Sequence, residues 1–434
     1  MKELEIVKDI LKNDHLFLTG GGGVGKSYLT TKLIDDYKLQ NRHVVILGST
    51  GISAVNIGGQ TIHSFFAFGI CQNTEELLRY DRYNKQRIKE INAMLLSAEL
   101  LIVDEISMVS AALMEMIRYR LDNASFKGSI LFVGDFFQLP PVDKNANAFS
   151  LFGGDEVYAF ESSAWKNYNP KIVELTNSKR TGDRKFFSIL NQIRKGELDC
   201  RVVDFLEILR KNDNVLKQNP TILFGTNYEA DKTNKARLAQ IQDELCILNA
   251  QETIHEKSLH TNRAETWRKS LNISLELELK RGANVIFCAN KWGKYFNGEQ
   301  GIIKDINENF LIVEKSDRLI RVEPHEFVLY ENILEDLQMK SKPLLTLKQF
   351  PLKLSYAITI HKSQGMSIEN LVCDISNIFE RSQFYVAISR AMSAKGLYIR
   401  YNGDDFETYL KKCVYVDDRV KEFYKNAKAV FIDG

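Results

Sequence analysis

Gly20-Gly21-Gly22-Gly23-Val24-Gly25-Lys26-Ser27 follows an apolar run, Leu16 to Leu18, and precedes a helical pattern that starts at Tyr28. Glycines in such a strand, loop and helix segment let successive backbone N–H groups curl around an anion, and the helix adds its positive N-terminal end. Lys26 then reaches the terminal phosphates of a nucleotide, and Ser27 offers a hydroxyl to Mg²⁺. The segment therefore predicts a phosphate-binding loop, with a glycine-rich surface turn as the alternative.

Length and composition predict a soluble chain of several domains. At 434 residues it is longer than one hydrophobic core usually serves, so we expect two or three domains. Charges at Lys2, Glu3 and Glu5 stand where a signal peptide would be apolar, and no run is long enough to span a membrane, so we expect a cytosolic protein without a membrane partner. The six cysteines form no C-x-x-C pair, which disfavours zinc and disulfides. A net charge of +2 indicates that any polyanion contact comes from a local groove.

Four apolar runs in the first third predict buried parallel strands that alternate with helices. They are Leu16 to Leu18, Val44 to Leu47, Leu100 to Val103 and Ile130 to Val133. Each run ends in glycine or polar residues, and open α/β sheets place their chemistry at the carboxyl ends of the strands. We therefore expect these four ends to converge on one edge of a sheet.

A second set of apolar runs predicts another α/β core between about residues 175 and 400. The runs are Thr221 to Phe224, Asn284 to Cys288, Tyr356 to Ile360, Leu371 to Asp374 and Gly396 to Arg400. Residues 295 to 350 differ, because alternating apolar and charged residues there predict a small β-rich insertion.

Two strand ends carry groups suited to phosphate chemistry. Asp104 can hold Mg²⁺, and the adjacent Glu105 can orient and deprotonate an attacking water. Gln138 follows another strand, where an amide can sense a γ-phosphate or its attacking water. Taken singly, the two carboxylates also fit a solvated turn, and Gln138 fits a plain loop ended by prolines. Their position after the phosphate loop favours the catalytic interpretation.

Six segments in order resemble the motifs of superfamily-one helicases, and the B-type branch fits best. They are Gly20 to Ser27, Gly48 to Ala54, Asp104 to Val109, Gly134 to Val142, His361 to Met366 and Phe384 to Ala391. Gly59 to Phe65 and Asn297 to Gly301 are similar to the petite-integration-frequency family of DNA helicases, with RecD-like enzymes as relatives. The resemblance covers nearly the whole chain.

The resemblance implies an α/β fold with two RecA-like parallel-sheet cores. Core 1A would span residues 1–172, with a wedge insertion at about 61–80. Core 2A would span 173–434, with an inserted SH3-like β domain at about 295–350 and a C-terminal helical segment at about 404–434. We expect Tyr409 to Phe431 to pack against the second core.

The same resemblance places ATP and Mg²⁺ between the cores, with Arg180 and Arg390 as arginine fingers that neutralise charge on the γ-phosphoryl group. The candidate catalytic residues are Lys26, Glu105, Gln138, Arg180 and Arg390, and the candidate metal ligands are Ser27 and Asp104. The candidate ATP-binding residues are Gly20, Gly23, Val24, Gly25, Lys26, Ser27, Tyr28, Gln138, Arg180, Gly365 and Arg390.

Single-stranded DNA would run across both cores on the face away from ATP, held without base specificity by polar groups. The candidate contacts are Thr50, His63, Phe65, Thr226, Asn227, Thr359, His361, Lys362 and Ser363. For His63 a structural role is the alternative. The wedge phenylalanines, Phe65 among them, either stack on bases or fill the core, as aromatic residues mostly do.

Two positions depart from the family pattern. The family usually has Phe-Arg-Gln where this chain has Lys179-Arg180-Thr181. The family also has a glutamine that reads adenine at the place of Glu3. Because of Glu3, GTP is a second nucleotide to test. Around Arg180, basic residues such as Arg184 and Arg194 fit a solvated helix face.

The sequence thus predicts a monomeric, ATP- and Mg²⁺-dependent DNA translocase that travels 5′ to 3′ and unwinds forked or structured DNA. Two other classes stay open. A different P-loop ATPase, such as a clamp loader or a polynucleotide kinase, would lack a second core carrying Arg390. A catalytically silent nucleic-acid clamp would bind DNA without ATP turnover.

Overall fold

A computed structural model describes residues 2–69, 71–141, 157–256, 259, 261–271, 273–291, 293–335, 338–376, 378 and 381–432. Val142, the last residue of one predicted motif, lies outside these ranges. Within them, no helix is both long and apolar enough to cross a membrane.

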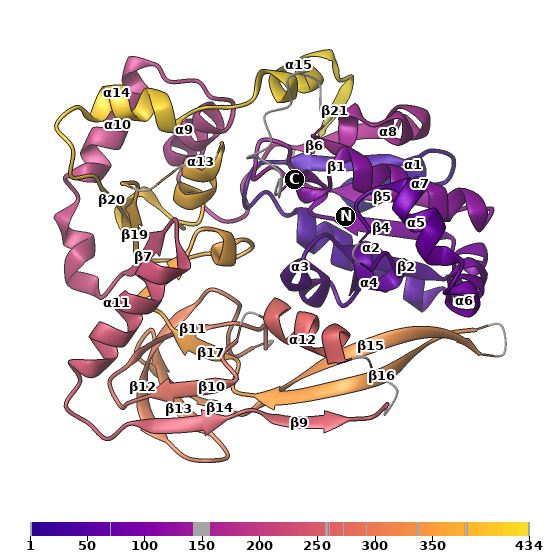
Figure 1. Cartoon of the computed structure of the whole chain (residues 1–434). Helices are drawn as coiled ribbons and strands as arrows, with labels where there is room; N and C mark the ends of the chain where they lie inside the picture. Colours follow the sequence, from indigo (N-terminus) through magenta and orange to yellow (C-terminus); the bar gives the residue numbers. More distant parts are fainter. Residues whose placement is uncertain are drawn as a thin grey trace.

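The first core is a seven-stranded sheet in which every pairing is parallel. In spatial order its strands are β21 (Ala429–Ile432), β6 (Lys171–Leu175), β1 (Leu16–Gly20), β5 (Ser129–Val133), β4 (Leu100–Asp104), β2 (Val44–Gly48) and β3 (Gln60–Thr61). Because β1, β5, β4 and β2 are neighbours and parallel, their carboxyl ends lie on one edge, as predicted. The sheet forms the right-hand body in Figure 1.

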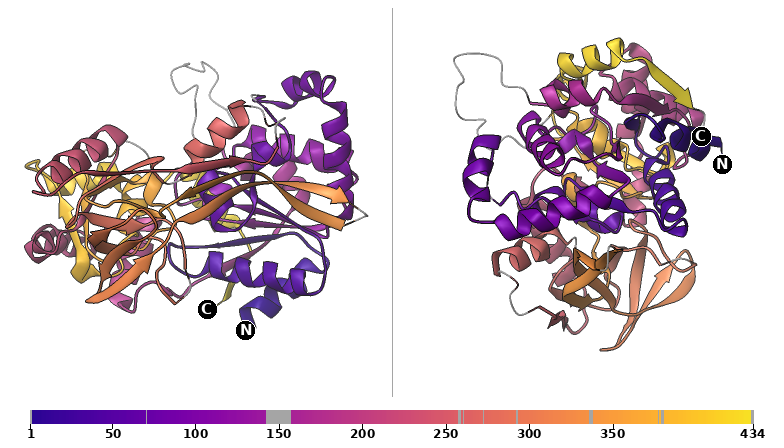
Figure 2. Two further views of the ribbon diagram at one scale, coloured as in Figure 1. Left: turned by 90° about the horizontal axis from the view of Figure 1, so that it is seen from below. Right: turned by 90° about the vertical axis from the view of Figure 1, so that its right-hand side faces the viewer.

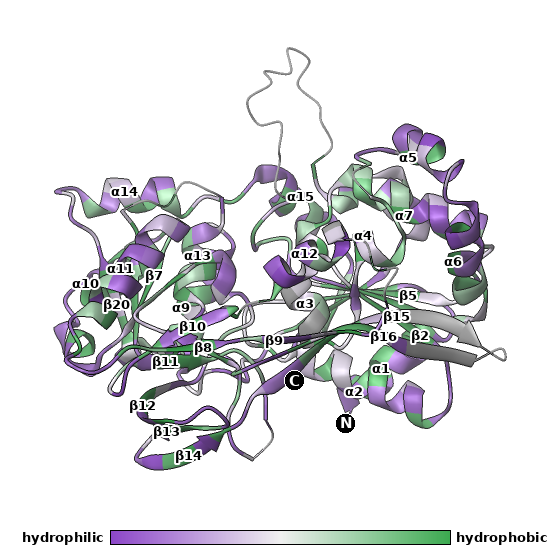
Figure 3. Cartoon of the chain, turned by 60° about the horizontal axis from the view of Figure 1, so that its bottom comes forward, coloured by the Kyte–Doolittle hydropathy of each residue, from purple (hydrophilic) through white to green (hydrophobic). Residues whose placement is uncertain are grey.

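Helices cover both faces of this sheet, because alternate strand residues enter two different apolar clusters. Leu16 and Leu18 pack with α1 (Lys2–Leu11) and α2 (Lys26–Leu39). Phe17 packs on the opposite face, in the cluster that includes residues of α6, α7 and α8. Those helices span Lys85–Ser97, Ala111–Asn123 and Ser163–Tyr168. The strands are accordingly hydrophobic, whereas the outward side of a helix such as α6 is hydrophilic (Figure 3).

The second core is a four-stranded parallel sheet in the order β18 (Ala357–Thr359), β7 (Thr221–Phe224), β19 (Leu371–Asp374) and β20 (Leu397–Arg400). Its helices are α9 (Arg184–Arg194), α10 (Cys200–Arg210), α11 (Asn227–Ala239), α13 (Gln383–Ile388) and α14 (Phe406–Cys413). Two parallel sheets with helices confirm the predicted α/β fold class.

One apolar run was wrongly placed in this core. Asn284 to Cys288 forms β11 (Asn284–Phe287), which pairs antiparallel with β12 (Gln300–Ile306) and β17 (Leu352–Leu354). It lies in a five-stranded sheet with β13 (Leu311–Lys315) and β14 (Arg318–Val322). An apolar run that is buried in a small antiparallel sheet has the same composition as a parallel core strand, which explains the error.

The antiparallel region is wider than residues 295 to 350. It begins at β8 (Cys246–Asn249), which pairs with β10 (Glu276–Leu279). β9 (Gln251–Ile254) joins a long hairpin of β15 (His325–Glu335) and β16 (Gln338–Gln349), and α12 (Thr261–Ser270) lies beside it. These sheets form the lower layer of Figure 1, beneath both cores.

The C-terminal segment returns to the first core, contrary to the prediction that Tyr409 to Phe431 packs on the second. Only its first part does so, in α14 and at the following Val414, through side chains such as Leu410. α15 (Asp418–Asn426) places Phe423 against the first core, and β21 then pairs with β6. The views in Figures 1 and 2 agree on this position. A mixed-charge amphipathic helix carries no signal for which of two cores it covers.

Phe423→Ala tests this attachment. The ring lies 4.5 Å from the Phe160 ring and 5.4 Å from the Phe136 ring, so its removal should lower the free energy of unfolding by about 3 kcal/mol. Phe431→Ala, at a side chain that is 67% exposed in the same segment, is the control and should change little. Urea unfolding followed by circular dichroism measures both, and equal effects would contradict the packing.

Candidate nucleotide site and adjoining groove

The phosphate loop joins β1 to α2 in the conformation that an anion cradle needs. Gly23 and Gly25 have φ angles of 80° and 99°, in the left-handed region that glycine adopts without strain. Gly25 caps α2 without a side chain, so the first N–H groups of the helix are left for an anion. Two further candidate ATP-binding residues differ in exposure. The side chain of Val24 is buried, so Val24 can offer only its backbone to a nucleotide, whereas Tyr28, at the start of the helix, is 70% exposed.

Lys26 lies inside this loop. Its ammonium Nζ donates hydrogen bonds to the carbonyls of Gly20 at 2.6 Å and Gly21 at 3.1 Å. Burial lowers the pKa of Lys26, while the carboxylates of Asp135 and Glu105 oppose that shift. In a nucleotide complex, phosphate oxygens could accept hydrogen bonds from this ammonium in place of the two carbonyls.

The carboxylates of Asp104 and Glu105, at the end of β4, lie in the electric field of the Lys26 ammonium. Burial, and next the neighbouring Glu105 carboxylate, raise the pKa of Asp104 to about 8. Burial also raises the pKa of Glu105, against the attraction of Lys26 and Arg390. Buried adjacent carboxylates of this kind gain from a divalent cation, which in nucleotide sites needs only one or two protein ligands besides phosphate and water. Asp104 and the exposed Ser27 fit that need.

Gln138 is held by a carboxylate. Its backbone N–H donates to the Asp135 carbonyl at 2.8 Å, and its amide Nε2 donates to the Asp135 carboxylate at 3.3 Å. Asp135 in turn binds Arg194, which is 2% exposed. The expectation that Arg194 belongs to a solvated helix face is therefore wrong. The sequence did carry the signal, since Arg194 follows Leu190 by four residues on the apolar stripe of α9.

Arg180 lies against the phosphate loop, and Arg390 lies close to Arg180 at the end of α13 in the second core. Arg180 Nε donates to Ser367 Oγ at 2.8 Å and its Nη1 to the Ser389 carbonyl at 2.5 Å. Burial, and then the Arg390 charge, lower the pKa of Arg180 to about 9. Burial also lowers the pKa of Arg390, although Glu105 attracts it.

These two guanidinium groups thus donate to neutral oxygens while repelling each other. Arg390 donates to the Val386 carbonyl at 2.9 Å and to Ser389 Oγ at 3.0 Å. Such a pair is suited to a bound anion between the cores. Gly365, at a φ of 77°, precedes Ser367 by two residues and shapes the turn that holds Arg180.

Comparisons with known proteins show the family to which this chain belongs. A family profile described as PIF1-like helicase matches residues 4–203. The ATP-dependent DNA helicase Pif1 of Campylobacter jejuni is 43% identical, covering 98% of this chain and 97% of that protein. The chain belongs to the Pif1 family of helicases. The predicted family is confirmed, and with it the assignment as an enzyme of the ATP-dependent helicase class.

Solved Pif1 structures share the fold. Bacteroides Pif1 in complex with ADP-AlF4 has a TM-score of 0.83 and 27% identity, with 98% of this chain and 96% of that one covered. Bacteroides Pif1 bound to single-stranded DNA covers the same shares at 26% identity but has a TM-score of 0.62. This Pif1-family chain therefore superposes more closely on the former structure.

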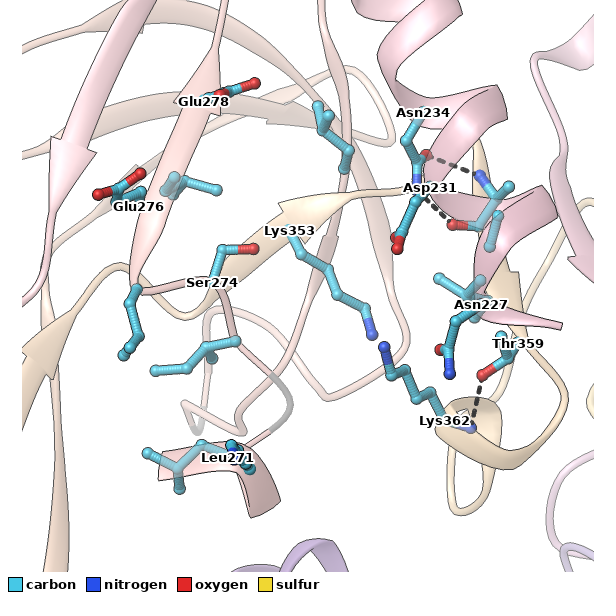
Figure 4. Close-up of a pocket in the computed structure, with 18 of the residues that line it drawn as sticks. Asn227, Asp231, Asn234, Leu271, Ser274, Glu276, Glu278, Lys353, Thr359 and Lys362 are labelled. Atoms are coloured by element: carbon cyan, nitrogen blue, oxygen red, sulfur yellow. Dashed lines mark hydrogen bonds between the residues drawn. The ribbon is translucent and has the colours of Figure 1, made fainter. Parts of the chain in front are cut away.

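Three of the candidate DNA contacts of this Pif1-family chain line one cavity of about 690 Å³ between the second core and the antiparallel region. They are Asn227, Thr359 and Lys362, and Figure 4 shows the side chains of Lys362 and Lys353 pointing toward one another across it. Burial lowers the pKa of Lys353, and the Lys362 charge adds to the effect. Sequence analysis missed Lys353, because a lone lysine in a strand carries no motif.

Other candidates are engaged or buried. The Ser363 side chain is fully buried and donates to the Ile360 carbonyl at 2.7 Å, and Phe65 is fully buried in the first core, so neither offers a surface to DNA. Thr226 caps α11 and donates to Glu229 at 2.8 Å. The remaining candidates are partly or largely exposed: Thr50 and His63 on the first core, and His361 on the second.

The second core touches the phosphate loop through Tyr385, which the sequence also did not single out. Its hydroxyl accepts the Gly22 N–H at 2.8 Å. An added Cβ at Gly23 would lie 2.5 Å from Arg180 Cβ, so the glycine also makes room for the arginine.

Gly23→Ala should therefore be more destabilising than a left-handed φ alone explains. Gly58→Ala is the control, because Gly58 has a φ of 68° and nothing within 4 Å of an added Cβ. We expect about 1 kcal/mol from the backbone in both variants. Gly23→Ala should lose about 1–3 kcal/mol more from the clash. Urea unfolding without nucleotide measures the difference, and equal losses would contradict the close approach of Arg180.

Proposed function

We propose that this chain is an Mg²⁺-dependent motor that uses ATP to travel 5′ to 3′ on single-stranded DNA and to unwind forked or structured duplexes. The observation that supports it is the position of Arg180 against the phosphate loop, with Arg390 of the second core close to Arg180. Charge that develops on a γ-phosphoryl group would be neutralised only when the two cores are closed. Hydrolysis would thus be tied to a movement of the cores.

In this proposal the first core supplies the chemistry of hydrolysis. Lys26 and the loop N–H groups hold the phosphates, and Glu105 takes a proton from the attacking water. Ser27 and Asp104 would hold Mg²⁺, which neutralises phosphate charge when bound. Gln138 orients the water or senses the γ-phosphate, and Arg390 stabilises the transition state from the second core.

Movement would follow from alternating grip. ATP draws the cores together, and hydrolysis lets them part. Contacts on the two cores, such as Thr50 and His63 on the first and Lys362 on the second, then release and regain the DNA in turn. One copy of the chain holds all these groups, so a monomer suffices for the cycle.

Of the two alternative classes, another kind of P-loop ATPase is disfavoured, because the chain has a second parallel-sheet core that carries Arg390. The silent clamp differs from the motor only in turnover. Catalysis therefore decides between them.

The deciding experiment measures ATP hydrolysis with and without single-stranded DNA. We expect strong stimulation, abolished in Lys26→Ala and slowed about 100-fold or more in Glu105→Gln, which should still bind ATP. Strand displacement should occur on a duplex with only a 5′ tail and not on one with only a 3′ tail. Lack of stimulation would remove the motor interpretation, and displacement from the 3′ tail would reverse the polarity. GTP is tested alongside ATP because of Glu3.

Lys353 provides a test of the DNA groove. Two ammonium groups that converge in one cavity attract a phosphate, and Lys353→Met removes one of them. We expect weaker binding of a fluorescent oligothymidylate and a decrease of about 1 in the slope of log Kd against log salt concentration.

Lys348→Met is the matched control, since Lys348 is an exposed lysine of the same antiparallel region and lies outside the cavity lining. Equal effects of the two variants on the salt slope would show that the cavity does not take a phosphate.

A further inference from the structure

A buried ion pair joins the two cores beside the phosphate loop. Arg194, the last residue of α9, donates from Nε and Nη2 to the Asp135 carboxylate at 3.0 Å and 2.9 Å. The two side chains are 3% and 0% exposed. α9 packs Phe186 and Ile193 into the second core, whereas Asp135 follows β5 of the first. The pair therefore crosses between the cores in the protein interior.

The same carboxylate organises the loop that carries Gln138. Asp135 accepts the Phe137 N–H at 3.2 Å and the Gln138 amide at 3.3 Å, besides both donors of Arg194. A carboxylate that accepts four donors is fixed in orientation, and the amide it holds is fixed with it. Loss of Arg194 would leave Asp135 free to turn.

The ion pair lies against the phosphate loop. A Cβ added at Gly21 would be 3.7 Å from Arg194 Cδ, and the Gly21 carbonyl accepts a hydrogen bond from Lys26 at 3.1 Å. The charge of Asp135 favours the charged form of Lys26, and the charge of Arg194 opposes it. Without Arg194, a buried and uncompensated carboxylate would compete with phosphate for the Lys26 ammonium and would repel the phosphate itself.

Further contacts hold the guanidinium in place. Its Nη1 donates to Glu174 of β6 at 2.7 Å, and its plane lies over the Phe137 ring at 4.9 Å. Tyr424 of α15 stacks on Phe137 at 4.5 Å and closes the site. The charge is thus enclosed by groups from both cores and the C-terminal segment.

We propose that Arg194 is a positioning residue for ATP hydrolysis, which neutralises Asp135 beside the phosphate loop. By doing so it leaves Lys26 available to the phosphates and holds the Gln138 amide in the orientation that meets the γ-phosphate. The inference rests on the proposed function and adds a residue to its machinery.

The experiment compares binding of ADP and of a nonhydrolysable ATP analogue to the full chain. Arg194→Met should weaken binding of the analogue by about tenfold or more, and binding of ADP much less, because the γ-phosphate carries the charge nearest Gln138. Arg184→Met, at an exposed residue at the other end of α9, is the control and should change neither.

The double variant Arg194→Met with Asp135→Asn gives the sharper test. Removing the Asp135 charge should restore part of the affinity for the analogue, because the Glu174 carboxylate, which Arg194 also binds, keeps its charge. If the double variant binds the analogue no better than Arg194→Met does, charge neutralisation is refuted. Equal weakening of ADP and analogue by Arg194→Met would show that Arg194 only pins the cores together, and would overturn the proposal.

Asp135→Asn alone keeps the inference testable if Arg194→Met does not fold. It removes the negative charge but loosens Gln138, so kcat should fall while KM for ATP does not rise. A raised KM with unchanged kcat would overturn the proposal. If the wild-type chain does not hydrolyse ATP, the proposed function fails, and the two binding comparisons still decide the role of Arg194.

Discussion

The structure depends on the close approach of the second core to the glycine loop of the first. Gly22 donates to a tyrosine of the second core, and Gly23 leaves room for Arg180 where any larger residue would overlap it. The backbone N–H of Arg180 also donates to the Gly23 carbonyl at 3.1 Å. A loop of ordinary residues would hold the cores apart, and the two guanidinium groups would then face water.

Electrostatics makes this closed junction receptive to a nucleotide. Opposite charges are buried close to one another but not all in pairs: Arg180 and Arg390 donate to neutral oxygens, and Asp104 and Glu105 lie side by side. Each arrangement is unfavourable by itself, because like charges in a low-dielectric interior repel strongly. A triphosphate would be the missing partner of the two guanidinium groups, and a cation bound with it would be that of the carboxylates, so the same features that destabilise the protein alone would favour binding.

Most of the fold and the first half of the site follow from short-range sequence patterns. The glycine loop, the four strand ends and the carboxylates of β4 are readable because each is set by neighbours along the chain. The errors concern choices between surfaces far apart in sequence. β11 resembles a parallel strand until its partners are known, and α15 could cover either core.

Arg194 and Ser363 show the same limit for single residues. A basic residue at a helix end is usually solvated, and only the apolar stripe of α9 indicates otherwise. Ser363 belongs to a motif whose polar residues are expected at a surface, yet a tight turn directs its hydroxyl to the Ile360 carbonyl. Burial of a particular side chain depends on tertiary contacts that a motif does not encode.

The return of the C-terminal segment has a mechanical consequence. The polypeptide passes from one sheet to the other between β6 and α9, and passes back between α14 and α15. Where two rigid bodies are joined by two covalent connections, rotation about the line through both connections is the least hindered motion. Twisting and sliding of one body against the other are resisted. Rotation about that line would open and close the junction at the phosphate loop along one repeatable path.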